Sequence, residues 1–279
     1  MTRQLILILA ASLIACNTAT NTGNDIHLNE TDPSPPREIT EKADIDEALE
    51  INFLEIETDI PFSGIYVNEG YFNTLLETKS PRIAQESCYK CMITIPESTL
   101  ERTIMIYNFH EGGGSLTVVK NDDHYQIWSL VNNKPESHLT DITLLTDTSI
   151  KVFNENFIKI GDIEDSSAGR KSPPVAEKLL FSGTYIDEDG NIAELGQGGE
   201  VKGIRNYSNY YPRLNYYDIG LDIDQVGFRD VTGEYDWFGF KFAGDTLLLY
   251  EIVCVDFNES MNLCERVDYG EVKHTLRKR

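Results

Sequence analysis

Basic residues are scarce in this chain, in which 24 Lys and Arg stand against 46 Asp and Glu and give a formal net charge of −22. Nucleic acid binding depends on Lys and Arg contacts to phosphates, so this balance argues against nucleic acid as a partner. The same balance argues against anionic lipid headgroups as a docking surface. An acidic, well-solvated surface of this kind suits an exported protein.

Long apolar runs are also scarce, and the one clear example lies at the N-terminus, between Leu5 and Leu13. It is shorter than the roughly 20 residues that a membrane-spanning helix needs. It fits the apolar region of an export signal, which has roughly 7–15 residues and follows a positive residue, here Arg3. We therefore expect an export signal, and the alternative is a buried N-terminal helix.

The end of that run, Leu13-Ile14-Ala15-Cys16, resembles the L-x-[AG]-C lipobox of bacterial lipoproteins. The resemblance implies that residues 1–15 are a signal peptide and that Cys16 becomes the first mature residue and carries the lipid. Two or three acyl chains, palmitate among them, hold a protein firmly in a membrane, whereas one holds it marginally. Asn17 replaces the Asp that would resemble the inner-membrane retention signal of enteric bacteria, which points to the outer membrane, on its periplasmic or surface face. An ordinary secretory signal, cut elsewhere, is the alternative.

Cysteine is rare too, because apart from Cys16 the chain contains only Cys88, Cys91, Cys254 and Cys264. An even number of cysteines in an oxidising compartment favours disulfides, one within Cys88 and Cys91 and one across an expected hairpin between Cys254 and Cys264. The alternatives are free thiols, a four-cysteine zinc site and a redox Cys-x-x-Cys. The second pair lacks the usual spacing of a zinc half-site, and no βαβ pattern surrounds the first.

Composition divides the chain after the signal into a tether, two modules and a linker. Residues 16–48 are rich in Asn, Thr, Pro and acidic side chains and low in hydrophobicity, which predicts a flexible tether after the lipidated cysteine. Residues 161–178 contain Ser, Gly and Pro and are expected to be a linker. The modules are then residues 49–160 and 179–279.

A short motif occurs once in each module. Residues 62–69 read FSGIYVNE and residues 181–188 read FSGTYIDE, so that five of the eight positions are identical. An internal repeat predicts two related structural units. The alternative is that Phe-Ser-Gly-x-Tyr is a generic beginning of a strand and the match is chance.

Strand signals recur about every ten residues through both modules, after one helical pattern near residues 71–76. Turn residues such as Asn121-Asp122-Asp123 separate them. The sequence thus predicts an all-β fold of two tandem antiparallel barrel- or sandwich-like modules, with a short helix in the first, after a disordered acidic tether. In the second module, strands are expected at 179–186, 216–221, 246–257 and 261–276, among others.

An opening Gly-x-aromatic strand, a short helix and a meander of strands resemble the lipocalin and fatty-acid-binding superfamily. Gly64-Ile65-Tyr66 and Gly183-Thr184-Tyr185 carry the resemblance, although those families usually have Trp where this chain has Tyr. The chain is also similar to two-module β lipoproteins of Bacteroidota-type bacteria, whose role is not established. An apolar cavity inside either module would favour carriage of a small ligand.

Motifs of known enzyme classes are missing. The chain has no Gly-x-Ser-x-Gly elbow and no αβ pattern. We therefore expect no catalytic residue, no metal and no cofactor, and an enzyme is the less favoured class. No Ser-His-Asp or His-rich metal set stands out among His27, His110, His124, His138 and His274.

An exported hydrolase is nevertheless the rival class, with His110, Glu111, Asp222 and Asp224 as its only candidates. His110 and Glu111 precede three glycines and are more simply part of a hairpin loop. Asp222 and Asp224 would share one face of a strand, as the paired carboxylates of a glycosidase must, although such residues are more often solvated. The run 187–191, DEDGN, has oxygen ligands at alternate positions but lacks the other residues of a calcium loop, so a hairpin turn is favoured.

Tyrosine and arginine are concentrated in residues 205–217, where Leu214 is the single aliphatic residue. Pro212 interrupts any ladder, so part of this stretch is expected to be a loop or an edge strand. Aromatic rings on a loop above a rigid scaffold are a common binding surface, and we expect the three central rings to be partly exposed and to line a groove. The candidate ligand-binding residues are Arg205, Tyr207, Tyr210, Tyr211 and Arg213.

The favoured function is a lipid-anchored envelope protein that acts as a ligand- or protein-binding module. The alternatives are an exported hydrolase and a purely structural envelope component. Its expected partners are the membrane, through the lipid, and an unknown small molecule, glycan or envelope protein.

Overall fold

The structure is a computed structural model that describes residues 59–99, 102–107, 109, 115–132, 134–162, 174–204, 206–218 and 220–279. The expected signal peptide, Cys16 and the tether lie outside these residues. Residues 51–279 belong to one compact unit. Within the described part, no helix has the length and apolar character needed to cross a membrane.

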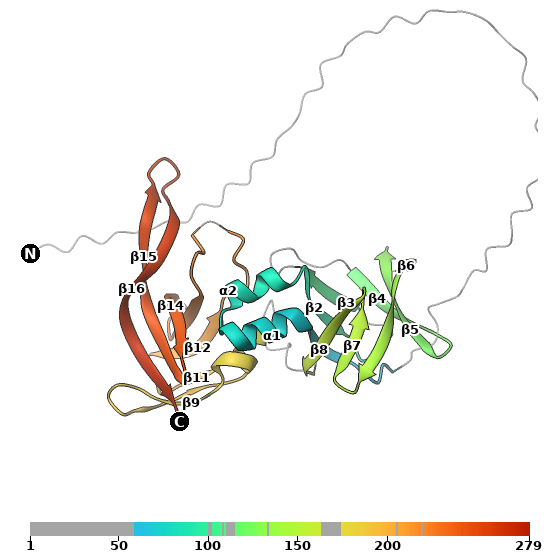
Figure 1. Ribbon diagram of the computed structural model, residues 1–279, viewed down its shortest axis with the longest axis horizontal. Helices are drawn as coiled ribbons and strands as arrows, with labels where there is room; N and C mark the ends of the chain where they lie inside the picture. The colour runs from blue at the N-terminus through green and yellow to red at the C-terminus, as the bar shows by residue number, and fades with distance from the viewer. Residues whose placement is uncertain are drawn as a thin grey trace, which may run out of the picture. The chain divides into compact units, whose positions relative to one another are not determined.

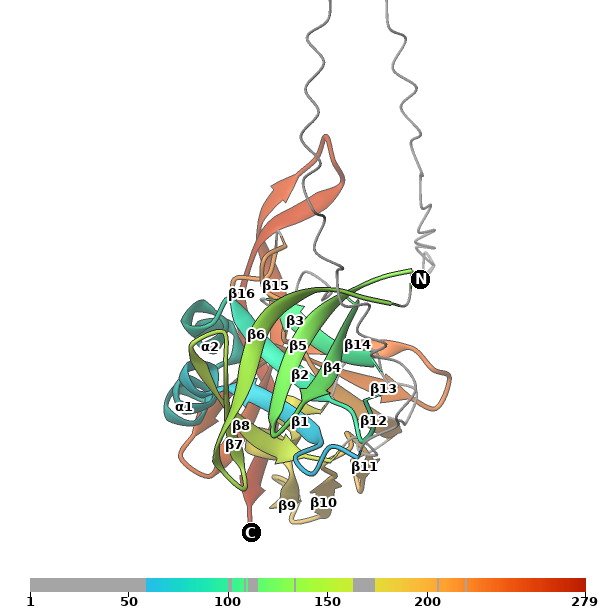
Figure 2. The same ribbon diagram turned by 90° about the vertical axis from the view of Figure 1, so that its right-hand side faces the viewer.

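The first module is a closed antiparallel barrel in which each strand pairs with the next and the last pairs with the first. Figure 2 shows its middle strands side by side. The register of closure places Tyr66 opposite Lys159. The strands are β1 (Gly64–Asn68), β2 (Lys90–Ile95), β3 (Arg102–Tyr107), β4 (Ser115–Asn121), β5 (His124–Val131), β6 (Lys134–Thr146), β7 (Ser149–Val152) and β8 (Glu155–Gly161).

The interior of this barrel is filled by side chains. Alternation along each strand directs every second residue inward, and the inward set is aliphatic or aromatic. The packed cluster therefore resembles a domain core rather than a ligand cavity. Its members are Ile60, Phe62, Tyr66, Ile93, Ile95, Leu116, Val118, Ile127, Ile142, Ile150, Val152 and Phe157.

Two short helices follow β1, namely α1 (Glu69–Thr78) and α2 (Pro81–Ala84). The Asn68 side chain caps α1 by accepting a hydrogen bond from the Gly70 N–H at 2.8 Å. The Ser80 side chain caps α2 in the same way through the Ile83 N–H, and Pro81 occupies the first turn, where a missing N–H costs nothing. The helix expected near 71–76 is confirmed, whereas Pro81 begins a second helix that the sequence analysis did not predict.

The second module is an eight-stranded antiparallel sheet with the order β11-β10-β9-β16-β15-β14-β13-β12. Its two ends approach each other, because the Tyr210 N–H donates to the Gly199 carbonyl at 2.7 Å and Glu200 bridges to Asn209. The strands are β9 (Gly183–Ile186), β10 (Ile192–Leu195), β11 (Val201–Lys202), β12 (Tyr207–Pro212), β13 (Gln225–Asp230), β14 (Tyr235–Ala243), β15 (Thr246–Asn258) and β16 (Leu263–Lys278).

The all-β fold of two antiparallel modules is as expected, and two strand assignments in the second module were wrong. A π-helical turn at Glu177–Phe181 precedes β9, so the strand expected at 179–186 begins only at Gly183. No described residue of 216–221 belongs to a strand. Pro212 ends β12, and the Asn215 side chain accepts from the Tyr217 N–H in a local turn that competes with strand pairing.

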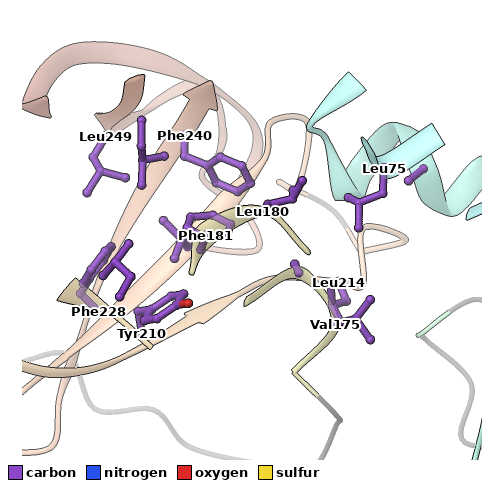
Figure 3. Close-up of a cluster of buried hydrophobic side chains, with 14 of the residues drawn as sticks. Leu75, Val175, Leu180, Phe181, Tyr210, Leu214, Phe228, Phe240 and Leu249 are labelled. Carbon is purple, nitrogen blue, oxygen red and sulfur yellow. The ribbon is translucent and has the colours of Figure 1, made fainter. Parts of the chain in front are cut away.

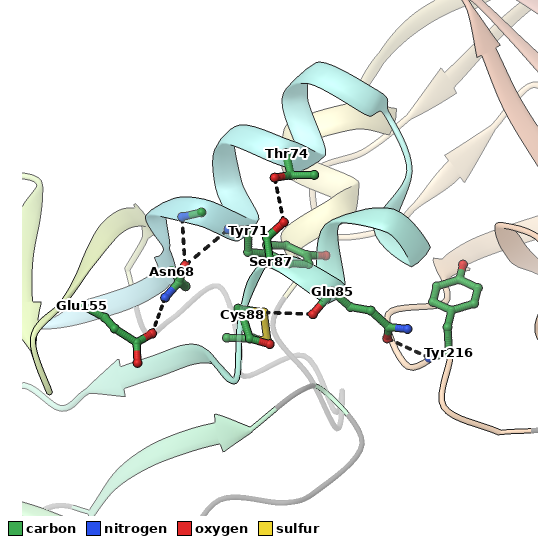
Figure 4. The surroundings of a disulfide bond; sticks show 10 residues. Asn68, Tyr71, Thr74, Gln85, Ser87, Cys88, Glu155 and Tyr216 are labelled. Carbon is green, nitrogen blue, oxygen red and sulfur yellow. Dashed lines mark hydrogen bonds between the residues drawn. A yellow bond between two sulfur atoms is a disulfide. The ribbon is translucent and has the colours of Figure 1, made fainter.

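The two modules share one apolar cluster (Figure 3). Residues of β1, α1 and α2 pack together with side chains of the second sheet, among them Leu75, Phe181 and Phe240. Two hydrogen bonds cross the same junction. The Arg82 N–H donates to Asp224 Oδ1 at 2.9 Å, and the Tyr216 N–H donates to Gln85 Oε1 at 3.0 Å (Figure 4).

The repeated motif forms the same corner in both modules. Tyr66 Oη donates to the Phe62 carbonyl at 2.7 Å, and Tyr185 Oη donates to the Phe181 carbonyl at 2.6 Å. Tyr66 pairs with Lys159 of the last strand of the barrel, and Tyr185 pairs with a lysine of β16. The five identical residues thus specify one local structure twice.

Candidate interaction surface

The hairpin formed by β15 and β16 is longer than the strand beside it. β14 has 9 residues, whereas β15 has 13 and β16 has 16. β14 pairs with β15 only as far as Tyr250, and from Ile252 to Asn258 β15 pairs with β16. Figure 1 shows the hairpin extending past the end of β14.

The turn of this hairpin is held by one asparagine. Asn258 Oδ1 accepts from the Ser260 N–H at 3.1 Å, from the Ser260 hydroxyl at 2.7 Å and from the Met261 N–H at 3.2 Å. The Asn258 amide in turn donates to Glu265 across the hairpin. Asparagine is suited to this role because its side chain reproduces the hydrogen bonds of a backbone turn.

Two further contacts stiffen the hairpin below its turn. Cys254 and Cys264 form a disulfide with a Cα–Cα distance of 5.8 Å. On the outer edge of β16, the Val267 N–H donates to Asp222 Oδ2 at 3.0 Å, and the Gly220 N–H donates to the Glu265 carbonyl at 3.1 Å. A crosslinked and braced hairpin loses little conformational entropy when a partner binds it.

Four large apolar side chains near the turn are exposed to solvent, and we call them the hairpin tip patch. Scattered exposed apolar residues are ordinary, but a group on one projecting element marks an interaction site. The exposed carboxylates Asp256 and Glu259 lie beside them in the chain. The patch consists of Val255, Phe257, Met261 and Leu263, which are 47%, 53%, 56% and 41% exposed.

The tyrosine stretch is placed differently from the expectation. Tyr207, Tyr210 and Tyr211 lie on β12, the last strand of the sheet order, which agrees with an edge strand. Tyr210 is fully buried, and its ring packs against Phe181. The expectation that all three rings are partly exposed was therefore wrong for Tyr210, because the sheet curls until its two ends meet over this ring.

The other two rings are half-buried. Tyr207 Oη donates to Asp236 Oδ2 at 2.8 Å, while its ring packs against Phe228. This hydrogen bond and burial raise the pKa of Tyr207, with burial as the larger cause. Tyr207 therefore contributes to the wall of the sheet.

Of the two arginines in that stretch, Arg205 lies outside the described residues. The Arg213 guanidinium lies 4.5 Å from the centre of the Trp237 ring, in cation–π contact. Arg213 Nε is buried and has no hydrogen-bond partner within the part of the chain that the structure describes. The structure thus separates Arg213 from any common groove with the buried Tyr210.

Both expected cysteine pairs are joined. Cys88 and Cys91 form a disulfide with a Cα–Cα distance of 5.1 Å, next to the 3₁₀ turn Gln85–Ser87 (Figure 4). With four cysteines in two disulfides, the zinc and free-thiol alternatives are wrong for this structure. Among the described residues, no group of His, Cys, Asp and Glu forms a metal site.

The hydrolase candidates do not come together. His110 and Glu111 lie outside the described residues. Asp222 is exposed and precedes β13, whereas Asp224 is buried, so the pair does not share one face of a strand. The expectation of a paired carboxylate face was therefore wrong.

Asp224 instead belongs to the junction between the modules. Burial raises the pKa of its carboxyl, against the opposing effect of hydrogen bonds from the Ser80 hydroxyl and the Arg82 N–H. The hydroxyl of Tyr71 is buried nearby and lacks a hydrogen-bond partner among the described residues, and burial and the charge of Asp224 raise its pKa. This arrangement is structural, because it offers no nucleophile with a base.

The possible calcium loop is an ordinary turn. Asp187 Oδ1 accepts from the Asn191 N–H at 2.7 Å and from the Asp189 N–H at 3.0 Å. The hydrogen bonds of Asn191 and Asp189 to this carboxylate lower its pKa, chiefly through the Asn191 side chain. Its oxygens therefore hold the hairpin turn, as the favoured interpretation expected.

Sequence reasoning missed the hairpin tip patch. The available signal was the length of the two strands around Cys254 and Cys264, with apolar residues continuing up to the turn. Comparison of the chain with protein-family models, curated proteins and solved structures found no match.

Proposed function

We propose that this chain is an exported, lipid-anchored protein of the cell envelope that binds a partner protein through the hairpin tip patch. The observation that carries the binding role is the exposure of Val255, Phe257, Met261 and Leu263 on a crosslinked hairpin. The lipobox-like Leu13-Ile14-Ala15-Cys16 supports the anchor, and the two disulfides support an oxidising compartment. The absence of the retention Asp supports the outer membrane.

The chemistry of the patch favours one kind of partner. Apolar side chains at the centre of an interface gain most when a pocket removes them from water. Asp256 and Glu259 flank them, so the complementary surface is an apolar groove with a basic rim. The same carboxylates disfavour insertion into anionic lipid headgroups.

Carriage of a small ligand inside the first barrel has less support. Its interior is occupied by a packed cluster that includes Tyr66, Ile127 and Phe157, each fully buried. A carrier would need these side chains to leave a cavity of several hundred Å³. The projecting surface is therefore the stronger basis for a binding role.

The anchor is tested by Cys16→Ser in cells that export the protein. We expect the substitution to abolish labelling by a palmitate analogue and to release the protein from the membrane fraction. A substituted protein that still sediments fully with membranes would refute the lipobox interpretation and leave the hairpin proposal standing.

The binding surface is tested by a photo-crosslinking residue at position 257 in the full-length protein in intact cells. The matched control is position 231, because Val231 is 80% exposed in the turn between β13 and β14. We expect a discrete protein adduct from position 257 that Met261→Asp abolishes, and no such adduct from position 231. Equal adducts from both positions, or lipid adducts alone at 257, would overturn the proposal.

A further inference from the structure

A second unusual surface lies on the outer wall of the first barrel, on β5 and β6 (Figure 2). Ile127 and Ile142 point into the barrel core. Because side chains alternate along a strand, Gln126 and Trp128 lie on the opposite, outer face. Asp141 is the cross-strand partner of Gln126, and His138 is that of Trp128.

A β-bulge builds this arrangement. Thr140 pairs with Ile127 and His138 pairs with Trp128, so Leu139 is an extra residue on β6. In a regular strand His138 and Asp141, three positions apart, would point to opposite faces. The bulge turns His138 to the outer face, which is a common use of bulges beside functional sites.

Four side chains are consequently joined in one outward-facing row, which we call the Trp128 platform. Trp128 Nε1 donates to Gln126 Oε1 at 3.2 Å, and Gln126 Nε2 donates to Asp141 Oδ1 at 3.0 Å. His138 Nε2 lies 3.1 Å from the same Asp141 oxygen, and the rings of Trp128 and His138 are 5.8 Å apart. Each side chain is thus oriented by its neighbour.

The platform also keeps hydrogen-bonding capacity on its solvent side. The His138 and Asp141 side chains are 42% and 65% exposed. Asp141 Oδ1 already takes both hydrogen bonds, so Oδ2 is free to accept. Gln126 has a second amide hydrogen, and His138 has a second ring nitrogen. Donors and acceptors therefore stand in fixed positions around the edge of an indole ring.

We propose that the Trp128 platform binds a glycan whose hexopyranose units have equatorial hydroxyls. Such a sugar presents a flat C–H face, which packs on an indole, and a rim of hydroxyls, each of which both donates and accepts. An indole with a polar rim matches both features. None of the four groups is a fixed cation, which disfavours phosphate or carboxylate ligands.

The test uses the full-length protein in detergent, with Trp237→Phe so that Trp128 is the single tryptophan of the two in the chain. The probes are cellohexaose and N-acetylchitohexaose, followed by Trp128 fluorescence and by calorimetry. We expect saturable binding of at least one probe. In calorimetry, Trp128→Ala should weaken it at least about tenfold, the equivalent of ~1.4 kcal/mol, and Trp128→Phe should weaken it less.

Asp141→Asn separates recognition from stability, because it keeps the size of the side chain and its exposed position. It should weaken binding by several fold without changing the melting temperature. Tyr235→Ala is the control, since Tyr235 is an exposed aromatic residue of the second sheet. No saturable binding of either probe below about 10 mM, or unchanged binding by Trp128→Ala, would overturn the proposal.

Discussion

The two modules have the same beginning and different elaborations. Each opens with Phe-Ser-Gly-x-Tyr, and in each the Tyr hydroxyl donates to the carbonyl four residues before it, at 2.7 Å for Tyr66 and 2.6 Å for Tyr185. After this corner the first module inserts α1 and α2, whereas the second makes a tight turn held by Asp187. The shared corner is scaffold, and the differences mark where each module has acquired a role of its own.

The last hairpins show the same contrast. In the first module β7 and β8 have 4 and 7 residues, whereas in the second β15 and β16 have 13 and 16. The added length carries a disulfide and the exposed patch. Extension of one hairpin beyond a common sheet is a simple way to give one copy of a duplicated scaffold a binding surface.

The largest expected effect separates the two corners at their glycines. Gly64 and Gly183 have φ of +145° and +153°, where other residues are strained. An added Cβ at Gly64 would lie 2.8 Å from the Gly161 carbonyl oxygen, which is backbone, whereas at Gly183 the nearest atoms belong to the flexible Lys278 side chain. We expect Gly64→Ala to lower the free energy of unfolding by about 3 kcal/mol and Gly183→Ala by about 2 kcal/mol. Chemical denaturation measures both, and the reverse order would contradict this reading of the corners.

The disulfides give the next largest contrast. Loop-closure entropy predicts that Cys254→Ala with Cys264→Ala costs about 2.8 kcal/mol, against about 1.9 kcal/mol for Cys88→Ala with Cys91→Ala, because the first loop is longer. Urea unfolding of the two double variants tests this order. A larger loss from the short loop would show that the helices, rather than the hairpin, depend more on their crosslink.

The tyrosine hydroxyls sharpen the likeness of the corners. Tyr66→Phe and Tyr185→Phe should each cost about 1 kcal/mol, since each leaves a buried carbonyl without its donor. Burial raises the pKa of both tyrosines to about 12, with the charge of Asp162 as a further cause at Tyr66. Their stabilisation is complete below pH 10 and is lost as the pH rises towards 12. Phe at both positions should reduce this alkaline loss, and an unchanged pH profile would contradict the shared role.

The smallest effect concerns the junction between the modules. Burial raises the pKa of Asp224 above its model value of 3.8, so the stability contributed by its protonated form falls as the pH rises through that raised pKa. Asp224→Asn keeps an acceptor for the Arg82 N–H and removes the buried charge. We expect a gain of about 1 kcal/mol at pH 7 and none at pH 3, measured by thermal unfolding. A loss at pH 7 would show that the charge itself holds the junction.

Much of the scaffold was predictable because it depends on local patterns. The repeated FSG-x-Y motif, the helix after Asn68 and the two cysteine pairs each arise from neighbouring residues. Tyr210 was misplaced because its burial depends on the curl that brings β11 to β12, residues that no short pattern connects. The hairpin tip patch was missed for a similar reason, since alternation predicts β15 and β16 but not that β14 ends beside Tyr250. The bulge at Leu139 is equally invisible in composition.

Occupancy of the hairpin tip patch is the central claim, and amide hydrogen exchange of residues 254–264 tests it most directly. The protein in membranes of its own cells would be compared with purified protein in vesicles of the lipids extracted from them, so that lipid contact is the same in both. We expect exchange at Val255, Phe257 and Met261 to slow in the native membranes, while the turn between β7 and β8 keeps its rate. Equal exchange at the tip in both preparations would contradict the claim that a partner protein binds there.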